Sequence, residues 1–385
     1  MSKICFTNAR VVLADGVSEA LDVVCTDGRI AEVRPRAGAK DGEVIDLGAN
    51  YLAPGFVDLH IHGALGRDTM EGTADAFRTI CDYHASGGTT SLLLTTATAP
   101  MPRILDVLRA ARRAMTHIPQ LAGVHVEGPF ISRERPGAQR AEFISDPRPD
   151  EIDQLLEFSD VMKRLTLAPE LPGAPAAIAR LRDRNVMVSG GHSDAWDEDA
   201  RVAFEHGMRH VTHTFNCMSS ARRRGAERVA GLLEFALSEP EMMCELIADG
   251  HHVSPTLMKM LYRAKGPDGI CLVTDATAGA GLPNGTHFDL AGHDCVVHGG
   301  VCWLADGSAL AGSAARMIDL VRTLVRSAGV PLHDVINMAT ASPARALQAS
   351  TKGKIEVGAD ADLVVFSAEF EVLQTFIAGR QVFAR

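Results

Sequence analysis

The chain has 385 residues, of which 46% are hydrophobic and 22% charged, and its formal net charge is −10. This balance is typical of a globular protein and excludes a disordered chain. The acidic charge weighs against nucleic acid as a partner, because binding to a phosphate backbone usually requires a basic face.

The N-terminal stretch MSKICFTNARVVLADG predicts a strand and a turn, and it lacks the charged and apolar regions of a secretory signal. No apolar run in the chain reaches the roughly 18 residues that a transmembrane helix needs. The eight cysteines are scattered without a CxxC pair, which favours reduced thiols over a disulfide framework. We therefore expect a cytoplasmic protein that does not bind membranes.

The two ends of the chain share a pattern that the middle lacks. Short β-rich runs separated by Gly and Asp turns begin the chain (ICFTNARVVLADG, LDVVCTDGRIAEV, EVIDLG) and end it (GKIEVGADADLVVFS, TFIAGRQVFA). Neither end alone has enough strands to bury a core. The pattern predicts a small β-sandwich made of residues 1–52 and 349–385, with a second domain, residues 53–348, inserted between them.

Within residues 53–348, short apolar runs alternate with stretches of helical periodicity such as ADAFRTICDYHASGG and ILDVLRAARRAM. Runs that are apolar nearly throughout suit a parallel sheet buried on both faces. Eight such repeats predict an α/β fold, a closed (β/α)8 TIM barrel. The eight runs are LAPGFVD, TTSLLLTT, LAGVHVEG, LTLAPE, NVMVSGGH, HVTHTFN, CELIADG and ICLVTDA.

Imidazoles and carboxylates stand at the ends of most of these runs. In a TIM barrel the C-terminal ends of the strands build the active site. Any one of these residues could be an ordinary loop residue, but the whole set at one end of one barrel predicts an active site. In chain order they are His60, His62, Glu127, Glu170, His192, His213, Asp249, His252 and Asp275.

Five of these residues form a candidate metal site. The alternation of a strand points His60 and His62 the same way, so they could hold one ion, although an isolated HxH pair is more often a packing feature. Glu127 would be costly to bury without a cation or a hydrogen-bond partner. With His192 and His213, the set suits Zn first, and also Fe, Co or Mn. We expect one or two divalent ions per chain, with a position open to water.

Asp275, in LVTDA at the end of the last run, is the candidate catalytic residue. A metal lowers the pKa of its bound water to about 7. A neighbouring carboxylate can take that proton and pass it to a leaving amine. The alternative is an Asp that only caps the following loop, ATAGAG.

The motifs PGFVDLHIHG, HVEGPF, GGHSDA, HTFNCMS, IADGHHV and LVTDATAGAG, in that order, resemble the N-acetylglucosamine-6-phosphate deacetylases of the amidohydrolase superfamily. The resemblance covers essentially the whole chain. It implies that Glu127, His192 and His213 hold the catalytic metal and that Asp275 is the general base and acid. Some members of the family also have the HxH pair and hold a second metal, which Glu127 would bridge. The run LAPE lacks the Lys that bridges two metals in dihydroorotases and hydantoinases, so it disfavours those enzymes.

The resemblance also implies a binding site for an amino-sugar phosphate. It includes an Arg that crosses from the partner subunit of a homodimer, one of Arg222, Arg223 and Arg224, with the latter two favoured. Adjacent Arg residues can clamp a phosphate, although a solvated basic loop would have the same sequence. The other contacts implied are Ala138, Gln139, Asn216, the backbone of Cys217, His252, Leu310, Ala311 and Gly312.

Two departures from the family pattern concern the substrate. The loop RPGAQ places Gln139 where the family usually has His, and RRRGAERVAG replaces REPG with one extra residue. The sequence thus predicts hydrolysis of N-acetylglucosamine 6-phosphate to glucosamine 6-phosphate and acetate. N-acetylgalactosamine 6-phosphate, an unphosphorylated amino sugar and a cyclic amide stay open as substrates. An inactive scaffold would have lost ligands that this chain keeps.

Overall fold

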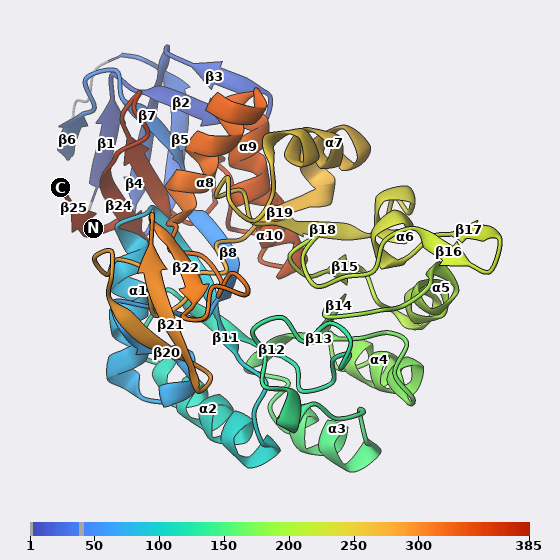
Figure 1. Cartoon of the computed structure of the whole chain (residues 1–385). Coiled ribbons are helices and arrows are strands. Elements are labelled where there is room, and N and C mark those ends of the chain that lie inside the picture. Colours follow the sequence, from blue (N-terminus) through green and yellow to red (C-terminus); the bar gives the residue numbers. More distant parts are fainter. Residues whose placement is uncertain (1–2, 38–41) are drawn as a thin grey trace.

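Both ends of the chain pair into one β-sandwich beside a barrel, as the computed structural model shows (Figure 1). The structure describes residues 3–37 and 42–385. One sheet has the order β5-β4-β1-β6 and the other β25-β24-β23-β7-β2-β3. Their strands are β1 Lys3–Thr7, β2 Arg10–Leu13, β3 Gly16–Ser18, β4 Leu21–Thr26, β5 Arg29–Pro35, β6 Glu43–Asp46, β7 Tyr51–Pro54, β23 Leu363–Phe366, β24 Val372–Ile377 and β25 Arg380–Ala384.

The sandwich joins the two ends through both pairing and packing. Strand β7 pairs antiparallel with β23, with Ala53 opposite Val364. Phe6 packs edge-on against Phe376 with ring centroids 5.0 Å apart. The prediction of a terminal β-sandwich is therefore confirmed. Its boundaries at 1–52 and 349–385 stay a prediction, and residues 1–2 and 38–41 of that range lie outside the described residues.

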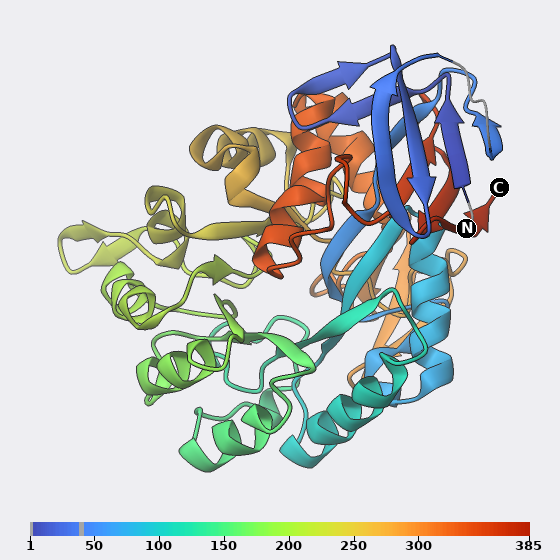
Figure 2. The ribbon, with the colours of Figure 1, turned by 180° about the vertical axis from the view of Figure 1, so that it is seen from behind.

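All eight apolar runs form strands of one parallel sheet, and a helix follows each strand, which confirms the (β/α)8 barrel. Figures 1 and 2 show these helices on the outside of the strands. The strands are β8 Phe56–Ile61, β11 Thr89–Thr96, β12 Leu121–Glu127, β13 Met162–Leu167, β14 Met187–Gly190, β15 His210–Val211, β18 Met243–Leu246 and β19 Ile270–Leu272. The helices are α1 Ala74–Ala85, α2 Met101–Ala114, α3 Pro149–Leu156, α4 Ala174–Arg182, α5 Asp197–His206, α6 Leu232–Ser238, α7 Pro255–Lys265 and α8 Met317–Thr323.

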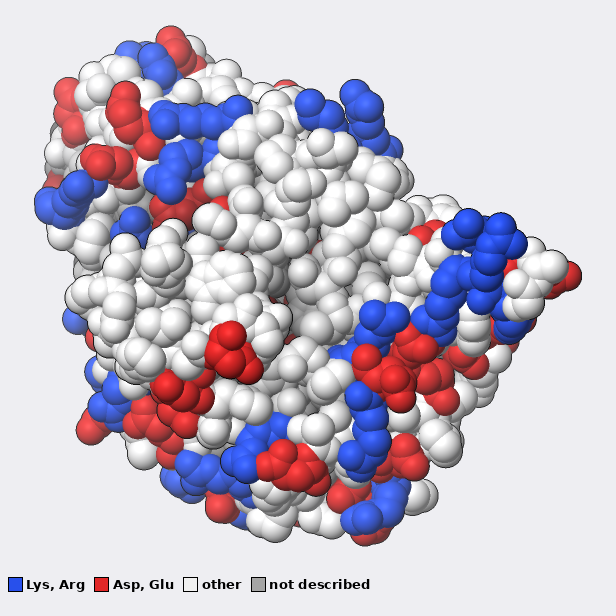
Figure 3. Space-filling model, in the orientation of Figure 1, with Lys and Arg blue, Asp and Glu red and all other residues white. Residues whose placement is uncertain are grey.

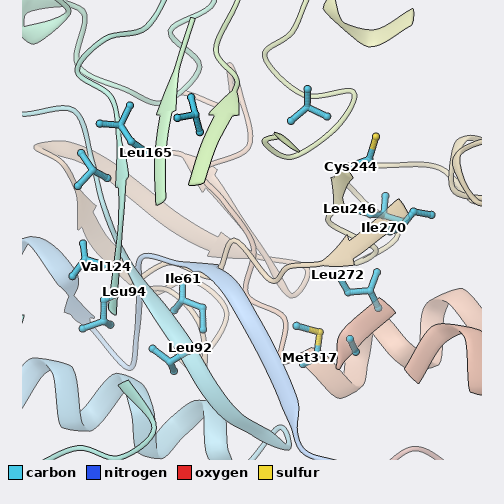
Figure 4. Packing of buried hydrophobic residues seen from close by; sticks show 14 of the residues in the cluster. Ile61, Leu92, Leu94, Val124, Leu165, Cys244, Leu246, Ile270, Leu272 and Met317 are labelled. Atoms are coloured by element: carbon cyan, nitrogen blue, oxygen red, sulfur yellow. The ribbon is translucent and has the colours of Figure 1, made fainter. Parts of the chain in front are cut away.

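The barrel core is built from aliphatic side chains between the strands and the helices. Leu92, Leu94 and Val124 alternate with residues that face the other side of their strands, and all three are buried (Figure 4). They belong to one cluster with residues of the helices, such as Ile104 and Leu108 of α2. Burying one such side chain contributes about 1.5–3 kcal/mol, so this layer fixes the positions of the strand ends.

The barrel closes between β19 and β8 through a few specific contacts. The buried Asp58 accepts hydrogen bonds from the hydroxyl of Thr274 at 2.7 Å and from the His60 amide at 3.2 Å. The Asp275 amide donates to the His60 carbonyl at 2.9 Å. The closure of the barrel therefore places His60, at the end of the first strand, beside Asp275, which follows the last strand.

Between β19 and α8 the chain forms a three-stranded sheet, β20-β21-β22, that the sequence analysis did not predict. Its strands alternate buried and exposed residues and pack on a small apolar cluster of their own.

No helix in the described part of the chain is both long and apolar enough to cross a membrane. The remaining elements are β9 Gly63–Ala64, β10 Arg67–Asp68, η1 Thr69–Glu71, η2 Ala141–Phe143, β16 Arg222–Arg224, β17 Glu227–Val229, η3 Pro267–Gly269, β20 His287–Leu290, β21 His293–His298, β22 Val301–Leu304, η4 Leu324–Ala328, α9 Leu332–Ala339 and α10 Ala341–Ala346.

Candidate active site

A cluster of histidines and carboxylates lies at the C-terminal ends of the barrel strands. Glu127, the last residue of β12, is at its centre and is buried. Its Oε2 atom lies 3.2 Å from His62 Nε2 and 3.6 Å from His60 Nε2. Its Oε1 atom lies 3.2 Å from the Nε2 atoms of both His192 and His213. Each carboxylate oxygen thus faces its own pair of imidazoles.

The two sets could each hold an ion, because their ligand atoms lie within 4.8 Å of one another. One set is His60, His62 and Glu127, and the other is Glu127, His192 and His213. Paired Nε2 atoms are only 3.0–3.2 Å apart in each set. Imidazole and carboxylate ligands in this number, with positions left open, are the donors of catalytic Zn sites and of related transition metals.

The outer nitrogens of three of these rings contact oxygen atoms. His192 Nδ1 lies 2.9 Å from the Arg135 carbonyl, and His213 Nδ1 lies 3.2 Å from the Asn216 carbonyl. His60 Nδ1 lies 3.3 Å from a carboxylate oxygen of Glu245. A ring that donates Nδ1–H to an oxygen presents its Nε2 lone pair to the cluster. The surroundings therefore fix the tautomer that binds a cation.

The charges of the cluster favour an ionised carboxylate at its centre. Burial would raise the pKa of Glu127, but the surrounding histidines, His60 first, hold it well below its usual range. Burial would lower the pKa of His62, yet hydrogen bonds with Asp275 and Glu127 raise it to about 9. These carboxylates therefore attract positive charge strongly.

Asp275 lies at the edge of the cluster, directly beyond β19. Its Oδ1 atom is 3.4 Å from the Nε2 atoms of His60 and His62. Burial would raise the pKa of Asp275, but these two rings lower it to about 2. The carboxylate is thus ionised at neutral pH and can accept a proton.

Strained backbone accompanies the cluster. His192, His213, Cys217 and Asp275 have φ values of 47°, 31°, 46° and 49°, in the left-handed region that side chains with a Cβ rarely adopt. Such conformations cost of order 1–3 kcal/mol each and concentrate at functional sites. The backbone conformations that orient these residues therefore lower the stability of the fold.

A cavity of about 260 Å³ opens above the cluster, and most of the predicted substrate residues line it. Ala311 is fully buried behind the wall, and His60 lies at the base of the cluster with no exposed surface. The predicted residues that line the cavity are His62, Glu127, Ala138, Gln139, His192, His213, Asn216, Cys217, His252, Asp275, Leu310 and Gly312.

Gln139 lies at the metal end of this cavity. Its side-chain nitrogen donates to Glu127 Oε2 at 2.9 Å, and its side-chain oxygen accepts from the Thr98 amide at 2.7 Å. Both ends of the amide are engaged within the protein. Its contact with the sugar stays a prediction, while its contact with the central carboxylate was not expected from the sequence.

Two acidic residues that the sequence analysis noted support the histidines. Asp249 Oδ2 lies 2.7 Å from His252 Nδ1, which directs the other ring nitrogen of His252 away from Asp249. Glu170 accepts hydrogen bonds from the Ser193 hydroxyl at 2.8 Å and the Asp194 amide at 2.6 Å. Glu170 belongs to neither ligand set and instead braces the loop that follows His192.

The three adjacent arginines lie on the β16–β17 hairpin, which projects from the barrel, and none lines the cavity (Figures 1 and 3). Arg222 pairs with Asp194 at 2.6 Å, and Arg224 pairs with Glu198 at 2.7 Å. Within the described residues, Arg223 has no acidic partner and bonds only to the Ala226 carbonyl of its own hairpin.

Several residues of the cavity wall were not predicted from the sequence. Gly137 lies against Cys217, since a Cβ at Gly137 would be 2.7 Å from the Cys217 sulfur, and its φ of +57° also favours glycine. Gly137 is within the quoted RPGAQ loop, so that motif did carry a signal. Thr277 likewise lies within the quoted LVTDATAGAG motif. The others are apolar residues without a chemical signature: Ala97, Leu290, Ala291 and Ala309.

Comparison with known proteins agrees with this geometry. Residues 51–382 match the amidohydrolase family. The chain is 34% identical to an N-acetylglucosamine-6-phosphate deacetylase of Lysinibacillus sphaericus, over 97% of this chain and 96% of the relative. It is 33% identical to an N-acetylgalactosamine-6-phosphate deacetylase of Escherichia coli O157:H7, over 96% and 97%.

A solved structure is also similar throughout its length. It is a variant of the Mycobacterium smegmatis N-acetyl-D-glucosamine-6-phosphate deacetylase in complex with N-acetyl-D-glucosamine-6-phosphate. It superposes with a TM-score of 0.93 at 31% identity, over 100% of both chains. The chain therefore belongs to the amidohydrolase family.

Proposed function

We propose that this protein hydrolyses the acetamide of N-acetyl-D-glucosamine 6-phosphate to D-glucosamine 6-phosphate and acetate. The observation that carries the proposal is the position of Glu127, whose two oxygens each face a pair of histidines beside Asp275. This arrangement opens into a cavity that the predicted sugar-binding residues line. The similarity to deacetylases of N-acetylated hexosamine phosphates supports the same reaction.

The residues present fit divalent metal ions, and we propose zinc, with Fe, Co and Mn as alternatives. His192, His213 and Glu127 would hold one ion, and His60 and His62 would hold a second through the other oxygen of Glu127. A divalent ion bound there supplies Lewis-acid activation of the attacking water and of the acetamide carbonyl.

Asp275 is the proton carrier of the proposed reaction. Its ionised carboxylate takes a proton from the attacking water as the new C–O bond forms at the acetamide carbon. It then gives that proton to the amine nitrogen as the C–N bond breaks, so that acetate and a free amino sugar result. His252, held by Asp249, lines the same cavity, and its free ring nitrogen would donate a hydrogen bond to the carbonyl oxygen as negative charge develops there.

N-acetylgalactosamine 6-phosphate is the second candidate substrate. The relative from Escherichia coli O157:H7 acts on this sugar by name and is about as similar to the chain as the glucosamine enzyme. Acetate release should be measured with both phosphorylated sugars and with free N-acetylglucosamine. We expect the highest kcat/KM for N-acetylglucosamine 6-phosphate, and the proposal fails if the galactosamine isomer is the better substrate.

If the HxH pair holds a second ion, elemental analysis of metal-replete protein should give two ions per chain. In His60→Ala the value should fall to one, because Oε2 of Glu127 and His62 are too few ligands to keep an ion. His287→Ala is a suitable control, since that exposed ring pairs only with Asp294. A stoichiometry of one in both wild type and His60→Ala would show that the pair is structural.

We propose that Arg223 of the partner subunit binds the 6-phosphate in a homodimer. Its guanidinium has no acidic partner within the described chain, whereas Glu198 holds Arg224. A charge-assisted hydrogen bond contributes about 1.5–3 kcal/mol, so Arg223→Ala should lower kcat/KM for the phosphorylated sugar by roughly 10- to 100-fold. The same change should leave the rate on the free sugar nearly unaltered.

Arg224→Ala is the matched control and should affect neither substrate strongly. Mixing Arg223→Ala with a subunit that lacks Asp275 should restore activity at hybrid sites, because one site per dimer then has both residues. Equal rates on phosphorylated and free sugar would contradict the phosphate proposal.

We also propose a cytoplasmic location, since all eight cysteines are free thiols.

A further inference from the structure

A buried ion pair lies in the barrel interior beneath the histidine cluster, and no step of the proposed reaction uses it. Arg164 of β13 pairs with Glu245 of β18, and their side chains are 0% and 1% exposed. Strands β14 and β15 separate β13 from β18 in the sheet. The two side chains therefore meet across the inside of the barrel.

Neighbouring hydroxyl groups hold the arginine in place. Its guanidinium donates to Ser189 Oγ at 2.7 Å and to Thr212 Oγ1 at 3.1 Å. A buried ion pair usually stabilises a fold no more than apolar residues of the same size would, because both charges lose their hydration. Stability alone therefore gives little reason for this pair.

The second oxygen of Glu245 contacts both ligand sets. Its Oε2 atom accepts the backbone N–H of His213 at 3.1 Å and lies 3.3 Å from His60 Nδ1. His60 belongs to one set and His213 to the other. Both groups must donate to this oxygen, since a carboxylate has no proton to offer when it is ionised.

The position of the ring proton of His60 decides whether its Nε2 atom can bind a metal ion. With Nδ1–H directed at Glu245, the Nε2 atom carries a lone pair and faces His62 Nε2 at 3.2 Å. A carboxylate behind a ligating histidine fixes its tautomer and increases its basicity.

We propose that Glu245, held in place by its pair with Arg164, is a positioning residue that sets the tautomer of His60 and thereby the affinity of the His60–His62 pair for a divalent ion. This inference rests on the proposed second ion. It adds a residue that contacts neither substrate nor metal, and that acts through the histidine it orients.

The test measures cobalt binding to the metal-free protein. The visible spectrum of the bound cobalt reports its ligands, and competition with a chelator gives its affinity. In Glu245→Gln the side-chain oxygen stays with Arg164, so the amide NH2 faces His60 Nδ1 and favours the tautomer that cannot bind metal. We expect the weaker cobalt site to lose about 10- to 100-fold in affinity. His60→Ala protein should hold only the cobalt ion of the Glu127, His192 and His213 set. Adding Glu245→Gln to it should change the affinity for that ion little.

Three further measurements keep the test decisive. The double variant Arg164→Met, Glu245→Leu removes both buried charges together, so it avoids the uncompensated charge that could unfold the single variant. It also removes the oxygen that accepts His60 Nδ1–H, so it should show the same weakened site. Asp362→Asn breaks the ion pair between the buried Asp362 and the partly exposed Lys352, far along the chain from the ligand sets, so it should lower the Tm but leave cobalt affinity unchanged. Acetate release by the wild type is measured separately, so that failure of the deacetylase proposal does not affect the cobalt result.

The inference is overturned if Glu245→Gln binds two cobalt ions with wild-type affinity and spectrum while only its Tm falls. It is also overturned if Glu245→Gln weakens binding equally with and without His60. A loss that requires His60 supports it.

Discussion

His192→Ala and His213→Ala should each lose the ion held with Glu127 and reduce deacetylation to background. Both rings lie 3.2 Å from the same oxygen of Glu127, and removal of either leaves two ligands for that ion. The buried carboxylate of Glu127 would also lose one of its four imidazole neighbours, so less of its negative charge would be compensated. Elemental analysis and acetate release on the same preparations measure both effects.

His210→Ala is the control for these variants. His210 is buried on β15, only three residues before His213, and it belongs to neither ligand set. Its replacement should cost stability but leave the ion content unchanged. A His192→Ala or His213→Ala protein that stayed metal-replete and active would remove the central assignment of the site.

Asp275→Asn should keep its ions and lose about 10²–10⁴ in kcat, which is the usual contribution of a positioned proton carrier. The amide is nearly the same size and can stay beside His60 and His62, so the ligand sets should persist. It cannot take a proton from the attacking water. Single-turnover measurements with N-acetylglucosamine 6-phosphate separate this loss from any change in binding.

Asp268→Asn, at an exposed position before β19, serves as the control and should have wild-type turnover. If Asp275→Asn turned over at a near-normal rate, Asp275 would be only a structural residue at the barrel closure. If it lost its ions, the carboxylate would be a ligand instead of a proton carrier.

The barrel was predictable because its strands leave a strong local signal. A parallel strand buried on both faces must be apolar nearly throughout, so eight such runs stood out from the helices between them. The β20–β22 sheet left no comparable signal, because its short strands mix exposed and buried residues around several glycines. Its contribution to the cavity, through Leu290 and Ala291, was therefore missed.

The ligand sets were predictable from strand ends, but their connections were not. Gln139 reaches Thr98 and Glu127, which are distant in the sequence, and no local pattern indicates that contact. Glu245 did leave a trace, since it is an acidic residue between the apolar Cys244 and Leu246 at the start of the run CELIADG. The partner of that residue, Arg164, belongs to a strand three positions away in the sheet, so only the closed barrel brings them together.

The pairing of the two chain ends has a consequence for biosynthesis. Arg29 donates to the carbonyl of Gly358, a residue 329 positions later in the chain. Ribosomes add roughly 5–20 residues per second, so the first strands wait on the order of 20–60 s for their partners to emerge. During that time, side chains such as Phe6 and Val23 lack the C-terminal strands that cover them in the finished sandwich. The nascent N-terminal segment therefore keeps these apolar side chains uncovered until the C-terminal strands are made.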